Sequence, residues 1–208
     1  MDFIISGLQG SGKGEQAARL AEEFEGDVFD MGATLRELAE QDSDLGRRIH
    51  AHLERGDLVP LALLQEIVTQ RIGDQPPDRP LFFDGFPRTS EQMAVLQGLL
   101  ENADRNCHLI HLVVSEDTAH KRIKSRAMAE GRTDDQDESV VQARMRVFDE
   151  ETLPMIVAHC EGGGAVTEID GEGSIDEVYG TTSRAVREIL TAEAADMTAV
   201  DEQDAGGS

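Results

Sequence analysis

The segment Gly7-Leu8-Gln9-Gly10-Ser11-Gly12-Lys13-Gly14 follows a short apolar run, residues 3–6, and precedes a run with helical periodicity, residues 13–25. Glycines in such a turn let successive backbone N–H groups face an anion, and the helix N-terminus adds a favourable electrostatic potential. Lys13 has the reach to contact the β- and γ-phosphates of a nucleotide. Strand, loop and helix together predict a phosphate-binding loop, or P-loop.

Short apolar runs alternate with longer helical segments along the rest of the chain, a pattern typical of a parallel α/β sheet. The predicted strands are residues 3–6, 27–31, 81–84, 109–114 and 166–169. The predicted helices are residues 13–25, 34–39, 61–71, 90–101, 116–125, 138–160 and 174–190. From residue 192 the composition becomes small and acidic, which predicts a disordered tail over residues 192–208 after one domain over residues 1–191.

The composition narrows the class of protein. The chain has 208 residues and a formal net charge of -23, and such a negative surface repels nucleic acids. A salt-rich cytoplasm and GC-rich coding would each favour this charge balance. We expect no nucleic-acid partner and, without an apolar run of about 18 residues, no membrane span. The first residues have neither the basic region nor the cleavage site of a secretory signal, so we expect a cytoplasmic protein.

Two motifs carry a resemblance to a known family. With Gly14, Glu15 and Gln16 after Lys13, the loop resembles the GxxGxGKGTQ loop of adenylate kinases and related nucleoside monophosphate (NMP) kinases, except that Glu15 replaces Thr. Asp84-Gly85-Phe86-Pro87-Arg88-Thr89 matches the family signature DGFPRT. The resemblance implies a P-loop fold: a five-stranded parallel sheet of order 2-3-1-4-5 flanked by helices. It also implies an NMP-binding helical subdomain near residues 31–60 and a short lid near residues 125–134.

The same resemblance implies a site for ATP as phosphoryl donor, with Mg²⁺. Asp84 ends a predicted strand, where a carboxylate is well placed to hold Mg²⁺ through water. Glu15 brings a carboxylate near the phosphates, so its side chain must turn outward or weaken ATP binding. The implied ATP-binding residues are Gly10, Ser11, Gly12, Lys13, Gly14, Glu15, Arg122 and Gly171.

An acceptor site is implied as well. Arg88 and Arg36 would hold the acceptor phosphate, a task that suits a planar guanidinium. Gln92 falls where adenylate kinases place the glutamine that hydrogen-bonds adenine, which favours AMP. Met31 replaces the family's Thr beside the base, and an apolar residue there favours UMP or CMP. The implied AMP-binding residues are Met31, Arg36, Val59, Gly85, Arg88, Gln92, Arg132 and Arg144.

Seven of the 19 Lys and Arg residues lie between positions 121 and 146. Their positions in the family pattern place three of them around the transferring phosphoryl group, where they would neutralise charge in the transition state. The implied catalytic residues are Lys13, Asp84, Arg88, Arg126, Arg132 and Arg144, with Arg146 as the alternative to Arg144. The chain has two cysteines, Cys107 and Cys160. We expect buried free thiols and no structural zinc in the lid.

Three hypotheses remain open. In the first, a monomeric adenylate kinase transfers a phosphoryl group directly from ATP to AMP and forms two ADP. In the second, the same fold phosphorylates UMP or CMP. In the third, suggested by Glu15, a degenerate P-loop protein binds nucleotide as a sensor. Lys13, Asp84 and Arg88, all present, argue against the third hypothesis.

Overall fold

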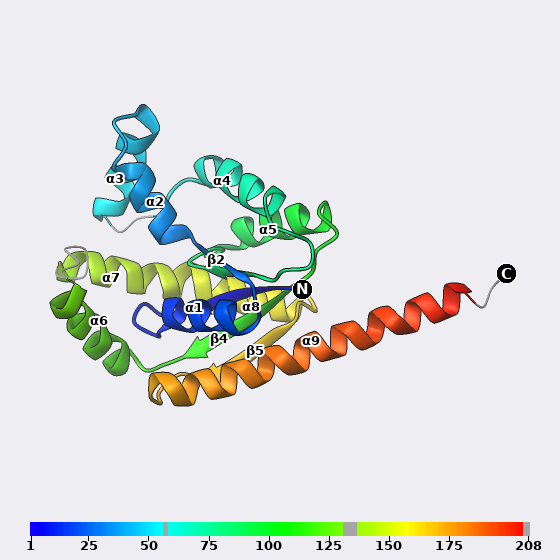
Figure 1. Ribbon diagram of the computed structural model, residues 1–208. Coiled ribbons are helices and arrows are strands. Elements are labelled where there is room, and N and C mark those ends of the chain that lie inside the picture. Colours follow the sequence, from blue (N-terminus) through cyan, green and yellow to red (C-terminus); the bar gives the residue numbers. More distant parts are fainter. Residues whose placement is uncertain (56–57, 131–136, 206–208) are drawn as a thin grey trace.

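The computed structural model describes residues 1–55, 58–130 and 137–205. Five parallel strands form one sheet of order β2-β3-β1-β4-β5 (Figure 1), which confirms the predicted sheet and its order. The strands are β1 (Asp2–Gly7), β2 (Asp27–Asp30), β3 (Leu81–Asp84), β4 (Cys107–Val113) and β5 (Val166–Asp170). The helices are α1 (Lys13–Glu23), α2 (Met31–Ala39), α3 (Asp44–Arg55), α4 (Leu61–Gly73), α5 (Ser90–Glu101), α6 (Glu116–Glu130), α7 (Glu138–Val147), the π turn η2 (Phe148–Thr152), α8 (Leu153–Glu161) and α9 (Ile175–Ala205).

Apolar side chains cover both faces of the sheet, because alternate residues of a strand point to opposite sides. Ile4 and Phe83 pack on one face with α4, α5 and α8. Phe3 and Phe82 pack on the other face with α1 and α9. A parallel sheet is typically buried on both faces in this way. The carboxyl ends of its strands lie at one edge, where such folds bind their ligands.

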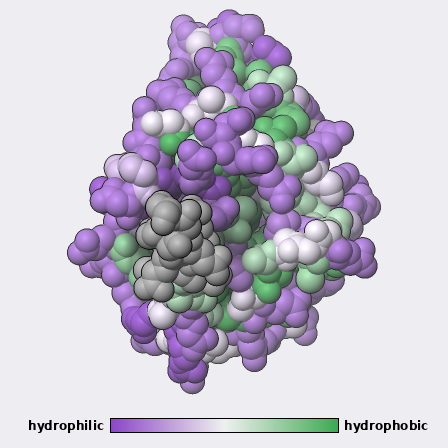
Figure 2. Space-filling model, turned by 90° about the vertical axis from the view of Figure 1, so that its right-hand side faces the viewer, coloured by the Kyte–Doolittle hydropathy of each residue, from purple (hydrophilic) through white to green (hydrophobic). Residues whose placement is uncertain are grey.

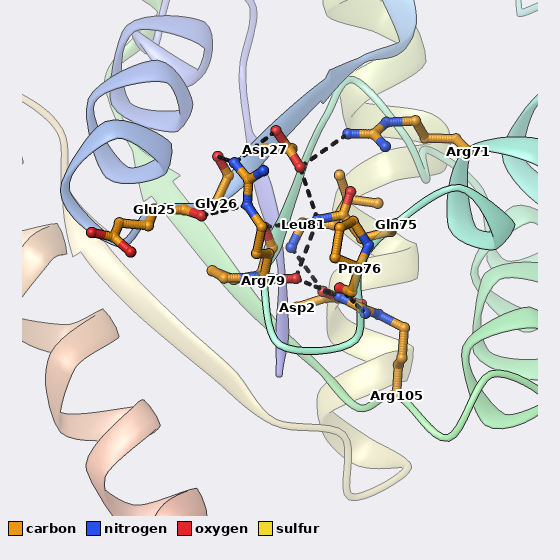
Figure 3. Close-up of polar contacts among 11 residues, drawn as sticks. Asp2, Glu25, Gly26, Asp27, Arg71, Gln75, Pro76, Arg79, Leu81 and Arg105 are labelled. Atoms are coloured by element: carbon orange, nitrogen blue, oxygen red, sulfur yellow. Dashed lines mark hydrogen bonds and ion pairs between the residues drawn. The ribbon is translucent and has the colours of Figure 1, made fainter.

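A polar cluster holds the opposite, amino edge of the sheet (Figure 3). The buried carboxylate of Asp2 accepts hydrogen bonds from the Leu81 N–H at 2.8 Å and from Nε of Arg105 at 2.7 Å. Arg105 also donates to the carbonyls of Pro76 and Arg79. The cluster therefore ties the first residues of β1 and β3 to the segment that leads into β4.

Some boundaries differ from the prediction. Helix α2 begins at Met31 rather than at residue 34, because the Asp30 carboxylate accepts the Ala33 N–H at 2.9 Å and caps the helix there. Helix α3 was not predicted. The helix predicted over residues 138–160 contains the π turn, and α7, η2 and α8 follow one another as a continuous rod in Figure 1.

Helix α9 continues beyond its predicted end at residue 190, to Ala205, where the sequence predicts disorder. Residues 191–205 contain neither Gly nor Pro and are rich in Ala, a strong helix former. The Met1 amino group forms an ion pair with Glu193 at 3.3 Å, and the last part of α9 runs away from the sheet in Figure 1.

The surface shown in Figure 2 is mainly hydrophilic, with smaller hydrophobic areas between the polar ones. Within the described parts of the chain, no helix has the length and apolar content that crossing a membrane requires. Cys107 and Cys160 are both free thiols; Cys107 is half-buried, but Cys160 is exposed near the end of α8, so its predicted burial is wrong.

Candidate active site

The loops at the carboxyl ends of the strands surround a cavity of about 660 Å³. It brings together most of the site residues predicted from the sequence. The predicted residues that line it are Gly10, Ser11, Gly12, Lys13, Gly14, Glu15, Met31, Arg36, Val59, Asp84, Gly85, Arg88, Gln92, Arg122, Arg126 and Arg144. Arg132 and much of the predicted lid lie outside the described residues.

The P-loop forms one wall of this cavity. Gly12 caps α1 with φ of 94°, a conformation that favours glycine, and this turn leads into the first N–H groups of the helix. The ammonium of Lys13 donates to the carbonyls of Gly7 and Leu8 at 2.8 and 3.0 Å. Burial lowers the pKa of Lys13 to about 8, against the opposing effect of Asp84. The loop therefore presents N–H donors and one partly buried lysine to an anion.

Asp84 lies beside this lysine at the end of β3. Burial raises the pKa of its carboxyl group, while Lys13 lowers it. A Cβ added at Gly14 would lie 3.1 Å from Oδ2 of Asp84, so the glycine leaves the space between the P-loop and the carboxylate open. Carboxylate oxygens are ligands that Mg²⁺ prefers, often through water. Asp84 therefore fits the metal role that the sequence predicts.

Arg88, predicted to hold the acceptor phosphate, lies in the loop after β3 and lines the cavity. Its Nε donates to the carbonyl of Gly85 at 2.9 Å. Gly85 has φ of 76°, and a Cβ there would lie 3.2 Å from Nη2 of Arg88, so a glycine is required at this turn. The Arg88 N–H donates to Oε1 of Gln92, whose side chain is buried in the first turn of α5. The phosphate clamp and the base reader predicted from the sequence are thus in direct contact.

The helical region predicted to bind the NMP supplies another part of the wall. Met31 and Val59 are buried there and line the cavity. Arg36 lies 4.0 Å from the carboxylate of Asp30, which also caps α2. Asp30 was not predicted as a site residue, although its place at the carboxyl end of a strand was a usable signal.

Arg122, predicted to bind ATP, links the P-loop to the loop after β5. It donates to the carbonyl of Gly173 at 2.8 Å and to that of Ser11 at 3.4 Å. In the loop between β5 and α9, Gly173 lines the cavity, whereas the predicted Gly171 does not. Gly171 packs against the end of β4 instead, where an added Cβ would lie 2.7 Å from Cγ1 of Val114.

The remaining arginines divide between the two sides. The positive charge of Arg126 acts on Lys13 and Asp84, and that of Arg144 acts on Arg88. Arg146 is exposed, whereas Arg144 lines the cavity, which favours Arg144 for the predicted role. Phe148 and Thr152 of the π turn also line the cavity, and neither was predicted from the sequence.

The sequence is similar to known proteins over most of its length. The sequence model described as adenylate kinase matches residues 5–163. An adenylate kinase of Thermus thermophilus is 38% identical over 177 residues, which are 85% of this chain and 91% of the relative. One of Phenylobacterium zucineum is 36% identical over 179 residues, 86% of this chain and 93% of the relative.

The chain belongs to the adenylate kinase family. It is a phosphotransferase with the P-loop fold of that family. Glu15 remains a departure in the family's loop; its side chain is exposed at the cavity wall. Among the described residues, no group of three or more His, Cys, Asp or Glu side chains is arranged to hold a metal ion.

Proposed function

We propose that this adenylate kinase family member transfers the γ-phosphoryl group of Mg-ATP to AMP and forms two ADP. One observation carries the proposal: a single cavity joins the P-loop with Lys13 to the acceptor pair Arg88 and Gln92. Donor and acceptor would meet there without a covalent enzyme intermediate, so the chain's task is positioning and electrostatic stabilisation.

In this proposal a phosphate oxygen of AMP attacks the γ-phosphorus, and the bond to the β,γ-bridging oxygen breaks. Lys13 and the P-loop N–H groups hold the ATP phosphates, while Arg88 and Arg36 hold the AMP phosphate. Arg126 on the Lys13 side and Arg144 on the Arg88 side would offset the negative charge of the transferring group. Arg132 is proposed for the same task from the family pattern alone.

Asp84 would hold Mg²⁺ through water. The ion, when bound, neutralises phosphate charge and orients the β- and γ-phosphates. The open space beside Gly14 and the carboxylate chemistry support this role for Asp84.

The choice of AMP rests on Gln92. The main-chain N–H of Arg88 can only donate, so the atom of the Gln92 amide that faces it must be the acceptor, Oε1. Nε2 of the amide is then the donor left for a base. Oε1 has a second lone pair, so the amide offers one donor beside one acceptor. Adenine, with a ring-nitrogen acceptor beside an exocyclic amino group, matches both; cytosine shares that pattern, whereas uracil and guanine present the reverse, a ring N–H beside a carbonyl oxygen. The names of the relatives favour adenine over cytosine.

A transfer experiment tests the reaction. The enzyme is mixed with AMP and ATP labelled in the γ-phosphoryl group, and the products are separated. Label in ADP at a one-to-one ratio to AMP consumed supports transfer of the γ-phosphoryl group to AMP. Label released only as inorganic phosphate, or no turnover despite ATP binding, would contradict the proposal and favour a sensor.

We also propose that the enzyme works as a monomer in the cytoplasm, with nucleotides as its partners. The net charge of -23 supports the expectation that nucleic acids are not among them. Size-exclusion chromatography with light scattering tests the monomer.

A further inference from the structure

The π turn η2 contains a threonine whose hydroxyl bonds to the main chain of a distant loop. Among the other helical threonines that the structure describes, Thr118 at the start of α6 bonds to the side chain of Glu172, and five bond within their own helix or at its start. The hydroxyls of Thr34, Thr69, Thr181, Thr182 and Thr191 each donate to the carbonyl four residues earlier in their own helix or at its start. The buried Thr152 instead donates to the carbonyl of Arg88, at 3.0 Å and 64 residues away in sequence.

The π turn explains why this hydroxyl bonds outside its helix. The carbonyl of Phe148, four residues before Thr152, accepts the N–H of Leu153, the i to i+5 bond that defines a π turn. Such turns are often found at functional sites. The bond across to Arg88 links the rod formed by α7, η2 and α8 to the loop after β3.

The turn also orients several residues toward the cavity. Arg144, Phe148 and Thr152 follow at intervals of four residues, and all three line it. In a regular α-helix each such step rotates the side chain by about 40°. A π turn holds more residues per turn, so four residues of it do not add to this rotation about the helix axis. Thr152 therefore stays on the same face of the rod as Arg144.

We propose that Thr152 is a positioning residue for Arg88. The proposal rests on the acceptor role given to Arg88 above. The main chain of Arg88 is held on both sides: its N–H by Gln92 and its carbonyl by Thr152. Thr152 therefore fixes the place from which the guanidinium reaches the acceptor phosphate and, through the Arg88 N–H, the orientation of the Gln92 amide.

The test compares Thr152→Val with Thr152→Ser and with Thr182→Val. Valine keeps the shape of threonine and removes the hydroxyl, and serine keeps the hydroxyl. Thr182 is the matched control, because it is buried in α9, donates to a carbonyl at 2.8 Å and does not itself line the cavity. Both valine variants lose one buried hydroxyl, so their melting temperatures should fall similarly.

We expect Thr152→Val to lose about tenfold in kcat/KM for AMP, through a misplaced Arg88, with KM for ATP unchanged. Thr152→Ser and Thr182→Val should stay within about twofold of the wild type. The inference would be overturned if Thr152→Val and Thr182→Val had the same kcat/KM for AMP. It would also be overturned if Thr152→Val raised the KM for AMP and the KM for ATP equally. If Thr152→Val melts below the assay temperature, Thr152→Ala is compared in its place.

Equilibrium titration with AMP separates this inference from the proposed reaction. A wild-type enzyme that makes no ADP would refute the reaction. If Thr152→Val then binds AMP about tenfold more weakly than Thr182→Val does, the positioning role stands without it; equal AMP affinities would refute that role as well.

Discussion

The main-chain N–H of Arg88 donates to Oε1 of Gln92 at 2.7 Å. Since only Oε1 can accept that proton, the bond orients the Gln92 amide and leaves Nε2 as its donor toward the cavity. The residue proposed to hold the acceptor phosphate thus also fixes the group proposed to read the acceptor base. Changes at Arg88 that move its main chain are expected to affect both tasks.

Arg88→Ala should lower kcat/KM for AMP about a hundredfold or more, because it removes a charge that acts on the reacting phosphates. Arg88→Lys should recover only part of the loss, since lysine lacks the paired donors. Initial rates at varied AMP measure the effect, with Arg184→Ala, an exposed change on α9, as the control. An Arg88→Ala enzyme with wild-type rates and an unchanged fold would show that the acceptor site is elsewhere.

The lowered pKa of Lys13 predicts a pH dependence. Its pKa is about 8 in the free enzyme, so the ammonium is lost above that pH and kcat/KM for ATP should fall. The decline in kcat should begin at higher pH, because bound phosphates raise the pKa of Lys13.

Rates measured from pH about 6.5 to about 9.5 test this dependence. In the Lys13→Arg enzyme, kcat/KM for ATP should no longer fall near pH 8, however slow this variant is, since arginine stays protonated. A decline kept in that variant would assign it to another group. Since the pKa of Lys13 is lower in the folded than in the unfolded chain, its contribution to the free energy of unfolding increases as the pH rises from about 8 to 10.5.

The buried pair of Asp2 and Arg105 predicts a stability effect without a kinetic one. Asp2→Asn leaves the guanidinium buried without its partner charge, so the free energy of unfolding should fall by about 3–5 kcal/mol. Below the melting temperature kcat/KM should not change, because the pair lies at the amino edge of the sheet (Figure 3), whereas the cavity lies at the carboxyl edge.

Urea unfolding of Asp2→Asn measures this difference. Arg47→Ala, which removes an exposed ion pair with Asp42, is the control and should hardly change stability. An Asp2→Asn protein as stable as Arg47→Ala would mean that the cluster does not hold the sheet edge.

The net charge of -23 predicts a salt-dependent fold. At low ionic strength the acidic groups repel one another over distances near 30 Å, and salt shortens this range to about 3 Å at 1 M. The melting temperature should therefore rise with salt, and to a similar extent in NaCl and KCl. A melting temperature independent of salt would show that the acidic groups are already neutralised by neighbours.

The sheet and much of the site could be predicted because their signals are local. A glycine-rich turn before Lys13 and the signature ending at Thr89 are contiguous in sequence, and burial of a parallel sheet makes its strands visible as apolar runs. The start of α2 was missed because Phe29 and Met31 extend an apolar pattern across the Asp30 cap.

The role of Thr152 depends on a contact with Arg88 across 64 residues, and the π turn beside it leaves no periodic signal in the sequence. Helix α3 was missed although Leu45, Ile49 and Leu53 follow at intervals of four residues, because the residues between them are mostly polar. The contact of Thr152 with Arg88 is thus set by tertiary structure, whereas the bounds of α2 and α3 had local signals.

The central claim is that Gln92, oriented by Arg88, selects AMP. Its most direct test is kcat/KM for AMP, CMP, UMP and GMP with saturating Mg-ATP, at low and at high salt, for the wild type and for Gln92→Leu. We predict that AMP is the best acceptor, that UMP and GMP are at least about a hundredfold poorer, and that Gln92→Leu reduces the difference by weakening AMP. UMP used as well as AMP by the wild type, or a preference for AMP unchanged in Gln92→Leu, would contradict the claim.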